Sequence, residues 1–295
     1  MQLDSAQLNA FACVIDEGSF ERAAAVLHVT RSAVSQRVKL LEERVGQVLV
    51  RRATPCTTTE AGQALYRHAR EVALSEADAL TAIGGGQQTS TRLAIGVNAD
   101  SLATWFPHAM AQAAEDQGIT FDIHVEDQDH SANLLRQGRV MAAVTADPQP
   151  VQGCKVLPLG TLRYRALASP AFMQRHFAQG VNAAALAQAP MLVFNRKDAL
   201  QARFGGRITR RKLAPPVHWV PEAHAFVMAT RGGLGWGMTP DPMVQDDLRT
   251  GTLMELIAGK PVDVPLYWQY WRLNVNALHR MTDAVQQAAA HVLRA

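Results

Sequence analysis

Residues Ser19 to Gly46 read SFERAAAVLHVTRSAVSQRVKLLEERVG, a stretch that predicts two short helices joined by a tight turn. The first helix is rich in alanine, runs from Phe20 to Leu27 and follows Ser19, a residue suited to cap it. The second is expected from about Arg31 to Val45, where Gly46 can supply a left-handed C-terminal cap. This order indicates a helix-turn-helix unit.

The predicted second helix has two different faces. Its apolar residues recur at the spacing of one helical face and are expected to point inward: Val34, Val38, Leu41 and Val45. A neutral-to-basic stripe forms another face: Ser32, Ser35, Gln36 and Lys39. Short hydrogen-bonding side chains at a helix N-terminus, followed by cations, suit a helix that enters the major groove of DNA. Periodicity alone leaves an ordinary amphipathic helix pair as the alternative.

The residues from position 31 to position 52 are strongly basic. The acids among them are Glu42 and Glu43, and the cations are Arg31, Arg37, Lys39, Arg44, Arg51 and Arg52. Residues 47–52 read as a short strand before a turn at Thr54-Pro55, as in the wing of a winged helix-turn-helix. We expect contacts to base edges or nearby phosphates from Arg31, Ser32, Ser35 and Gln36. Contacts to the DNA backbone or minor groove are expected from Lys39, Arg51 and Arg52.

A longer pattern extends through this unit: Phe20-x-x-Ala23-Ala24-x-x-Leu27-x-Val29-Thr30-x-Ser32-Ala33-Val34-Ser35-x-x-Val38-x-x-Leu41-Glu42-x-x-Val45-Gly46, then Leu49-x-x-Arg52 and Thr59-x-Ala61-Gly62. With it the chain resembles the LysR-type transcriptional regulators. The stretches 97–105 and 125–127 resemble the ArgP/LysG branch of that family. This resemblance implies that the protein senses lysine or arginine and controls a basic amino-acid exporter. Gln36 stands where many relatives carry arginine, so the base preference of the family does not transfer.

A long amphipathic helix is expected after the wing. Thr59 is placed to cap a helix from Glu60 to about Ile83, whose apolar residues recur every three or four positions: Leu65, Ala69, Val72, Ala79 and Ile83. Such a stripe predicts pairing with a partner helix, and packing within the same chain is the alternative. The LysR-type resemblance implies a homodimer or tetramer through this helix. Two recognition helices would then lie about one DNA turn (~34 Å) apart on a pseudo-palindromic operator, with RNA polymerase as a further partner.

Three consecutive glycines mark the clearest boundary in the chain. Residues 84–90 read as a flexible joint and lack the Lys-Ser/Thr of a phosphate-binding loop. We therefore expect a winged helix-turn-helix domain at 1–58, a linker helix and joint at 59–90, and an effector domain at 91–295.

Short apolar strands alternate with helices from residue 91 onward, which predicts βαβ units and a parallel sheet. The expected strands are 93–97, 121–125, 140–144, 164–168, 191–194, 217–220, 236–238 and the aromatic-rich 264–271. A helix is expected from Asp100 or Ser101 to about Glu115. The family resemblance implies a two-lobe, type 2 periplasmic-binding-like fold, with lobe I at 91–162 and 265–295 and lobe II at 163–264. Crossovers near Leu162 and Val264 would be hinges, and the cleft would hold the effector.

Polar side chains gather at the predicted strand ends, where α/β sheets bind ligands. Those of lobe I are Asn98, Asp100, Ser101, Glu126, Asp127 and Thr145, and those of lobe II are Asn195 and Glu222. The hydroxyl and N–H groups near Ser101 suit a carboxylate, and the acids suit an ammonium or guanidinium, so L-lysine or L-arginine is the expected effector. Structural roles are the alternatives: Asp100 as a helix cap, Glu126 and Asp127 in a solvated loop, and Glu222 as a partner of a helix dipole.

The sequence lacks the patterns of catalysis, metal binding and cofactor binding. His124 and His130, like His218 and His224, lack zincin spacing, Ser169 lacks a GxSxG elbow, and Gly232–Gly237 closes a helix instead of opening one. The separated Cys13, Cys56 and Cys154 predict packing residues in a reducing cytoplasm. The N-terminal residues show no secretion signal, and no apolar run has membrane-spanning length. We expect a cytoplasmic protein that is not an enzyme and needs no cofactor.

Composition is compatible with this interpretation. The chain of 295 residues is long enough for two or three compact units, and 48% of its residues are hydrophobic. Because the net charge is only +3, any affinity for DNA must come from a local patch. Two other functions stay open at this level. One is an architectural or replication-origin-binding DNA protein without a small effector. The other is a two-lobe solute-binding or enzymatic protein, against which the missing secretion signal and catalytic spacing count.

Overall fold

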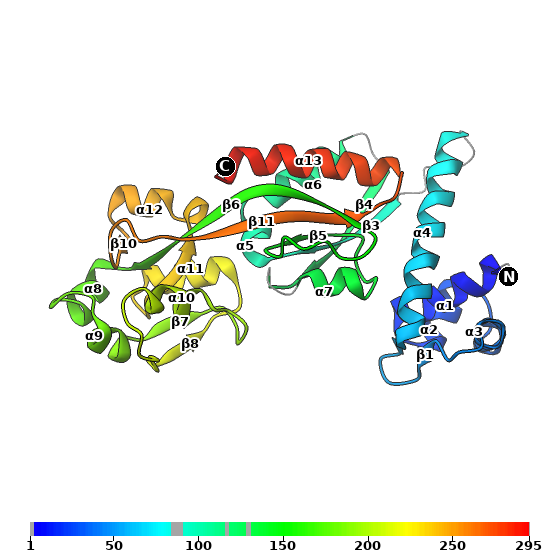
Figure 1. Ribbon diagram of the computed structural model, residues 1–295, viewed down its shortest axis with the longest axis horizontal. Coiled ribbons are helices and arrows are strands. Elements are labelled where there is room, and N and C mark those ends of the chain that lie inside the picture. The colour runs from blue at the N-terminus through cyan, green and yellow to red at the C-terminus, as the bar shows by residue number, and fades with distance from the viewer. Residues whose placement is uncertain (1–2, 84–90, 116–117, 128–130, 295) are drawn as a thin grey trace.

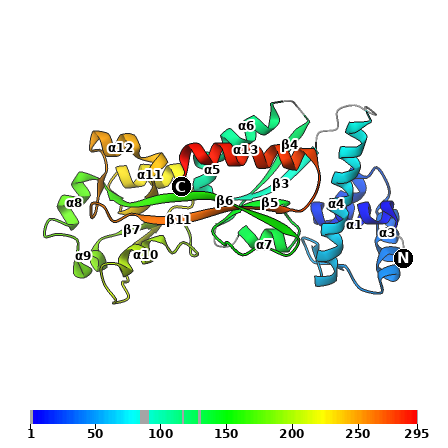
Figure 2. The ribbon, with the colours of Figure 1, turned by 45° about the horizontal axis from the view of Figure 1, so that its top comes forward.

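The computed structural model describes residues 3–83, 91–115, 118–127 and 131–294. The molecule is elongated, with the N-terminal helices at one end and a two-lobe domain extending to the other (Figures 1 and 2). The joint expected at 84–90 and His130 lie outside the described residues.

The N-terminal module contains the predicted helix-turn-helix. Its helices are α1 (Ser5–Glu17), α2 (Phe20–Val26) and α3 (Arg31–Val45). The Ser19 hydroxyl accepts hydrogen bonds from the first amides of α2, and the Thr30 hydroxyl accepts one from Ala33 at 3.2 Å. Both caps satisfy amides that have no partner within the helix. The inward residues Val34, Val38 and Leu41 are fully buried, as their spacing predicts.

The wing is a hairpin whose strands are shorter than the strand predicted at 47–52. Its strands, β1 (Val50–Arg51) and β2 (Thr57–Thr58), pair in antiparallel register. The Glu42 carboxylate of α3 accepts hydrogen bonds from the amides of Leu49 at 2.8 Å and Val50 at 3.2 Å. This carboxylate therefore anchors the wing to the end of the recognition helix.

Helix α4 (Glu60–Ala82) contacts both ends of its own chain. Leu65 and Ala69 of the predicted pairing stripe pack on the N-terminal core, and Leu74 enters the core of the two-lobe domain. Ile83, from the same stripe, and the neighbouring Leu80 are exposed at 76% and 51%. Part of the stripe thus packs within the chain, and its C-terminal part is uncovered in the single chain.

Polar contacts also join α4 to the two-lobe domain. Arg67 donates hydrogen bonds to the carbonyl oxygens of Gln152 at 2.7 Å and Gly153 at 3.0 Å, and its guanidinium lies 5.2 Å from the ring centroid of Trp271. Asp78 accepts a hydrogen bond from the amide of Asn276 at 3.2 Å. The described part of α4 is therefore docked along the first lobe.

The two-lobe domain is built on a mixed sheet with the order β10-β6-β11-β5-β3-β4, in which β9 also pairs with β6. These strands are β3 (Thr91–Val97), β4 (Ile119–Val125), β5 (Ala142–Thr145), β6 (Cys154–Ala168), β9 (Gly237–Pro240), β10 (Met254–Glu255) and β11 (Val262–Trp271). Strands β7 (Met191–Val193) and β8 (Val217–Trp219) form a separate parallel pair. Leu162 and Val264, the two predicted crossovers, are direct register partners on β6 and β11.

Helices surround the strands of the two-lobe domain (Figure 2). They are α5 (Ala99–Ala103), α6 (Phe106–Ala114), α7 (Ser131–Arg136), α8 (Pro170–His176), α9 (Ala183–Gln188), α10 (Leu200–Gly206), α11 (Ala223–Arg231), the 3-10 helix η1 (Asp241–Met243), α12 (Gln245–Thr250) and α13 (Asn276–Val292). The single helix expected from residue 100 or 101 to 115 is instead two helices, because the chain breaks at Thr104 and buries Trp105 completely against Phe106.

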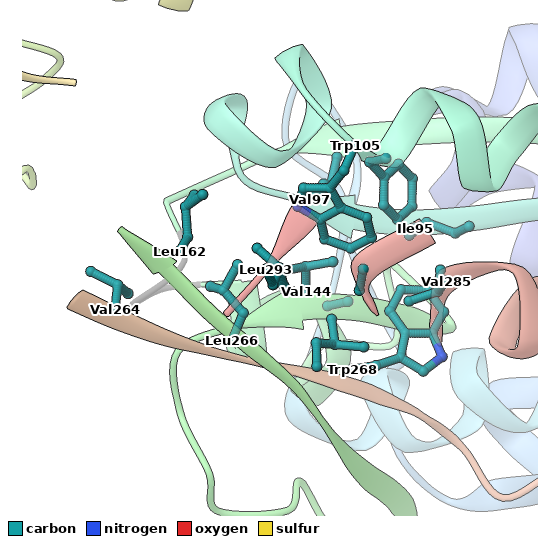
Figure 3. Packing of buried hydrophobic residues seen from close by; sticks show 14 of the residues in the cluster. Ile95, Val97, Trp105, Val144, Leu162, Val264, Leu266, Trp268, Val285 and Leu293 are labelled. Carbon is teal, nitrogen blue, oxygen red and sulfur yellow. The ribbon is translucent and has the colours of Figure 1, made fainter. Parts of the chain in front are cut away.

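The first lobe encloses a large apolar core (Figure 3). Ile95, Val97 and Val144 come from the parallel strands, and Trp268 and Val285 close the core from β11 and α13. The indole of Trp268 donates a hydrogen bond to the Thr282 hydroxyl at 3.1 Å, which fixes α13 on the sheet. None of the helices in the described ranges is both long and apolar enough to cross a membrane.

Helix α13 ends against the strands that cross between the lobes. Thr161 of β6 exchanges backbone hydrogen bonds with Arg294, at 2.7 and 3.0 Å. The Arg294 side chain also lies 3.3 Å from the Asp241 carboxylate, which follows β9 in the second lobe. At its other end, α13 begins at the Asp78 contact with α4.

Candidate effector cleft and DNA-binding face

A cavity of about 110 Å³ lies between the two lobes. The ends of β3 and β4 supply its first wall, and the loop after β7, the start of α11 and strand β9 supply the second. Five of the residues predicted from the sequence line it: Asn98, Asp100, Glu126, Asp127 and Asn195. The fold therefore brings together polar side chains that are separated by up to about a hundred residues in the chain.

Three other predicted residues do not line this cavity. Ser101 is fully buried inside α5, and Thr145 is fully buried and accepts a hydrogen bond from the amide of Asp147 at 3.1 Å. Glu222 caps α11, because its carboxylate accepts hydrogen bonds from the amides of His224 at 3.0 Å and Ala225 at 2.6 Å. These backbone hydrogen bonds lower the pKa of Glu222. Its position is that of the helix-dipole partner considered as the alternative.

Asn98 contributes an unsatisfied amide to the cleft. Its side chain is 2% exposed, and neither its nitrogen nor its oxygen has a hydrogen-bond partner among the described residues. The hydroxyl of Thr239, on the opposite wall, is also buried without a partner in the described chain. A buried polar group without a partner costs about 1–3 kcal/mol. Both groups would recover that cost by bonding to a polar ligand.

Asp100 supplies a carboxyl with an unusual environment. The pKa of Asp100 is raised to about 6: burial raises it most, a hydrogen bond from Tyr164 lowers it, and the nearby carboxyls of Asp198 and Asp127 raise it. That bond joins the Tyr164 hydroxyl to Oδ2 of Asp100 at 2.7 Å. The tyrosine thereby positions the carboxyl. A cationic ligand would favour its ionised form.

The loop after β7 is built by its own side chains. The Asn195 side-chain oxygen accepts hydrogen bonds from the amides of Lys197 at 2.7 Å and Asp198 at 3.2 Å. The Asp198 carboxylate accepts from the amides of Phe194 at 3.1 Å and Leu200 at 3.0 Å. These bonds hold Asn195 and Asp198 at the cleft wall.

The predicted DNA-binding residues lie together at the other end of the molecule. Arg31, Ser32, Gln36 and Lys39 are exposed on α3, Ser35 is half-buried beside them, and Arg51 and Arg52 are exposed in the wing. Arg31 pairs with Glu21 at 2.8 Å, and Arg52 lies over the Phe20 ring at 5.1 Å. The α3 residues and the wing thus form one basic face, which we call the recognition face.

Comparison with known families covers nearly the whole chain. Residues 5–63 match the family described as "Bacterial regulatory helix-turn-helix protein, lysR family". Residues 86–294 match the one described as "LysR substrate binding domain". The chain belongs to the LysR family of DNA-binding transcriptional regulators. The resemblance found in the sequence is confirmed, and the protein is a regulator and not an enzyme.

Known LysR-family proteins match this regulator over nearly their full lengths. "HTH-type transcriptional regulator LysG" of Mycobacterium tuberculosis is 48% identical over 294 residues, which are 99% of this chain and 96% of that protein. "Lysine export transcriptional regulatory protein LysG" of Corynebacterium glutamicum is 42% identical over 98% of both chains. A solved structure of full-length LysG from Corynebacterium glutamicum "with bound effector Arg" aligns with a TM-score of 0.81 and 41% identity, over 99% of this chain and 100% of that one.

Three residues of this LysR-family regulator were not predicted as site residues: Asp198 and Thr239, which line the cleft, and Tyr164, which contacts the lining residue Asp100. Asp198 precedes the helix that begins at Leu200, and an aspartate before a helix is a cap signal that was open to detection. Thr239 lies on β9, and the strand predicted there ended one residue earlier, at Met238. Tyr164 was expected only as the start of a strand, and no local pattern indicates its contact with Asp100, which lies 64 residues away.

In the part of the chain that the structure describes, no group of three or more His, Cys, Asp or Glu side chains is arranged to hold a metal ion. Cys13 and Cys154 are buried, and burial raises the pKa of both thiols. These two cysteines occupy packing positions, as their separation in the sequence predicts.

Proposed function

We propose that this LysR-family regulator senses a basic amino acid, L-lysine or L-arginine, in the interlobe cleft and controls the gene of a basic amino-acid exporter. The observation that carries the proposal is the pairing of unsatisfied buried amide and hydroxyl groups with a set of carboxyls in one cleft. The names of the relatives support the same ligand class, since one is a lysine export regulator and one holds arginine as its effector.

The cleft chemistry fits the two ends of such a ligand. The Asn98 amide and the Thr239 hydroxyl can donate hydrogen bonds to an α-carboxylate. Asp100, Glu126 and Asp127 offer oxygens to an ammonium or guanidinium group, with Asp198 beside them. An uncharged side chain would offer these carboxyls no cation in a partly desolvated site, which makes it a poorer ligand than a basic one. The site should therefore discriminate strongly by charge.

The DNA-binding part of the proposal rests on the recognition face. Arg31, Ser32, Ser35 and Gln36 would meet base edges or nearby phosphates, and Lys39, Arg51 and Arg52 would contact the backbone or minor groove. A homodimer or tetramer through α4 would place two such faces on a pseudo-palindromic operator in the cytoplasm. We divide the chain into DNA-binding, linker and effector parts at residues 1–58, 59–90 and 91–295.

Effector binding would act by shifting populations. A ligand that touches both walls of the cleft stabilises the closed arrangement of the lobes more than the open one. Rotation about the paired crossovers at Leu162 and Val264 would change how the lobes are presented to α4 and to the partner subunit. The spacing of the recognition helices on DNA would change in response.

Calorimetric titration of the full-length protein tests the ligand assignment. L-lysine or L-arginine should bind, and L-norleucine, which has the carbon chain of lysine without its ammonium group, should not. Asp100→Asn should weaken binding by about tenfold, since a hydrogen bond to a charged group is worth about 1.5–3 kcal/mol. Glu222→Gln is the matched control and should bind like the wild type, because that carboxylate caps α11 outside the cleft.

Equal heats for lysine and norleucine would refute the charge-based recognition. A mobility-shift assay then tests the regulatory target, with promoter DNA of a basic amino-acid exporter gene as the cognate probe and scrambled DNA as the control. The cognate probe should bind more tightly, and its complex should change mobility or affinity when the basic amino acid is added. A protein that binds both probes equally, with or without the amino acid, would be the architectural alternative.

A further inference from the structure

An ion pair joins the two lobes beside the cleft. The Lys197 ammonium, on the loop after β7, lies 2.8 Å from Oε1 of Glu126, on the loop after β4. Glu126 lines the cleft, and Lys197 lies between Asn195 and Asp198, two further lining residues. The Lys197 ammonium therefore occupies the Glu126 carboxylate, one of the groups that we propose to bind the cation of the effector.

Both partners are held in place by backbone contacts. The amide of Lys197 donates to the Asn195 side chain at 2.7 Å, which fixes the turn that presents the lysine. On the opposite lobe, the amide of Glu126 donates to the carbonyl oxygen of Val97 at 3.2 Å. Oε1 of Glu126 also accepts a hydrogen bond from the amide of Asp127 at 3.0 Å. The carboxylate would thus keep its position after the lysine had left.

The pair is weak enough to be exchanged. The Lys197 and Glu126 side chains are 49% and 30% exposed. Ion pairs that are exposed to this extent change an equilibrium constant by at most about fivefold, so replacing the lysine by another cation costs little. The pair of Arg294 with Asp241 lies at the crossover strands and away from the cleft lining, and the hydrogen bond from Tyr164 to Asp100 lies at another point of the cleft.

We propose that Lys197 is an internal counter-ion that the cationic group of the effector displaces from Glu126. The inference rests on the proposed function and adds a specificity-determining residue to it. In the effector-free protein, Lys197 neutralises Glu126 and holds the lobes together at this point. The ammonium or guanidinium of the ligand then pairs with the Glu126 carboxylate, and the bound ligand replaces the Lys197–Glu126 pair as the link between the two walls of the cleft. Lys197 therefore sets the ligand concentration at which the sensor responds.

Removal of the competing cation should tighten effector binding. Titration of the full-length Lys197→Gln variant with L-lysine or L-arginine should give a Kd up to about fivefold lower than that of the wild type, the range set by an exposed ion pair. Lys197→Arg should keep the wild-type Kd within about twofold, because it preserves the cation.

The neighbouring cation provides the matched control. Arg196 lies over the Trp219 ring at 5.5 Å and is not part of the cleft lining. Arg196→Gln removes the same charge one residue away, so a general change in the field of the cleft would affect both variants alike. The proposal requires tighter binding for Lys197→Gln and an unchanged Kd for Arg196→Gln.

A double-mutant cycle ties the effect to Glu126. In the Glu126→Gln background the competing pair is absent, and Lys197→Gln should then leave the Kd unchanged. Weaker binding by Lys197→Gln would mean that the lysine contacts the ligand, and equal gains in both backgrounds would mean that it acts through the general field. Either result overturns the inference while the wild type still binds the basic amino acid. A wild type that binds neither amino acid overturns the proposed function instead.

Discussion

Asp100 is the residue whose charge state should be easiest to observe. Its pKa is raised to about 6, chiefly by burial, so a falling pH protonates it well above the usual range of an aspartate. A protonated carboxyl no longer attracts a cation. The affinity for lysine or arginine should therefore be full near pH 8 and fall as the pH passes through about 6. Calorimetry from pH 5 to pH 8 checks this, with Asp100→Asn expected to lose the step around pH 6.

The same pKa has a consequence for stability without ligand. Between the ordinary pKa of aspartate and about 6, the folded protein binds the Asp100 proton more readily than the unfolded chain does. The contribution of this residue to stability is therefore present at lower pH and is lost as the pH rises through about 6. At pH 7 the Asp100→Asn variant should melt at a higher temperature than the wild type in the absence of effector. An equal or lower melting temperature would contradict the raised pKa.

Two residues of the recognition face should differ in what they read. Gln36→Ala should relax base discrimination, since one good contact to a base edge is worth about 1–3 kcal/mol. Arg52→Ala should weaken binding to all sequences alike and reduce the salt dependence by about one phosphate contact. Titrations of cognate and scrambled DNA at several salt concentrations separate the two effects. Identical losses on both DNAs for Gln36→Ala would refute its role in reading bases.

At the scale of elements, the wing depends on one carboxylate of α3. Glu42 accepts hydrogen bonds from the amides of Leu49 and Val50, so Glu42→Ala leaves both amides without this partner. We expect a loss of about 1–3 kcal/mol in the free energy of unfolding, measured by denaturant titration. Glu43→Ala is the control: that exposed residue pairs with Lys39 at 3.6 Å, and its loss should change stability by less than about 0.5 kcal/mol.

Individual elements were predictable where a local signal was sufficient. The caps Ser19 and Thr30 and the inward spacing of Val34, Val38 and Leu41 define α2 and α3 from within 30 residues. Strand β6 was predicted only from Tyr164 onward, and its earlier part contains Pro158 and Gly160, two residue types that argue against a strand. The fold accommodates both residues beside the register shift at Leu266/Tyr267 of β11, a partner about a hundred residues away. Long-range pairing of this kind leaves no local pattern.

The candidate site divides in the same way. Asn98, Asp100, Glu126 and Asp127 follow β3 and β4, and the rule that parallel strands end at one edge brings them to the cleft. Glu222 was expected at the same cleft, but a carboxylate just before a helix is equally suited to capping, and the hydrogen bonds to His224 and Ala225 decide the outcome. The choice depends on where α11 begins in space, which the sequence does not give.

At the scale of the whole molecule, assembly should depend on the outer part of α4. Leu80 and Ile83 expose apolar surface in the single chain, which is costly unless another surface covers it. Leu80→Asp should shift the protein toward monomers in light scattering after size-exclusion chromatography. Met254→Asp, a change at an exposed apolar residue in the second lobe, should leave the mass unchanged. A Leu80→Asp variant that kept the wild-type mass would remove α4 as the main contact between subunits.

Helix α13 has an attachment at each end. Asp78 of α4 holds its first turn, and Thr161 and Asp241 hold the chain just after its last turn. A helix of 17 residues spans roughly 25 Å at about 1.5 Å per residue and resists stretching. It is therefore a rigid connection of fixed length between those points. A rotation of the second lobe that moves Asp241 would therefore also pull on α13. If the proposed lobe movement occurs, α13 would carry it to α4 and so couple the effector cleft to the DNA-binding module.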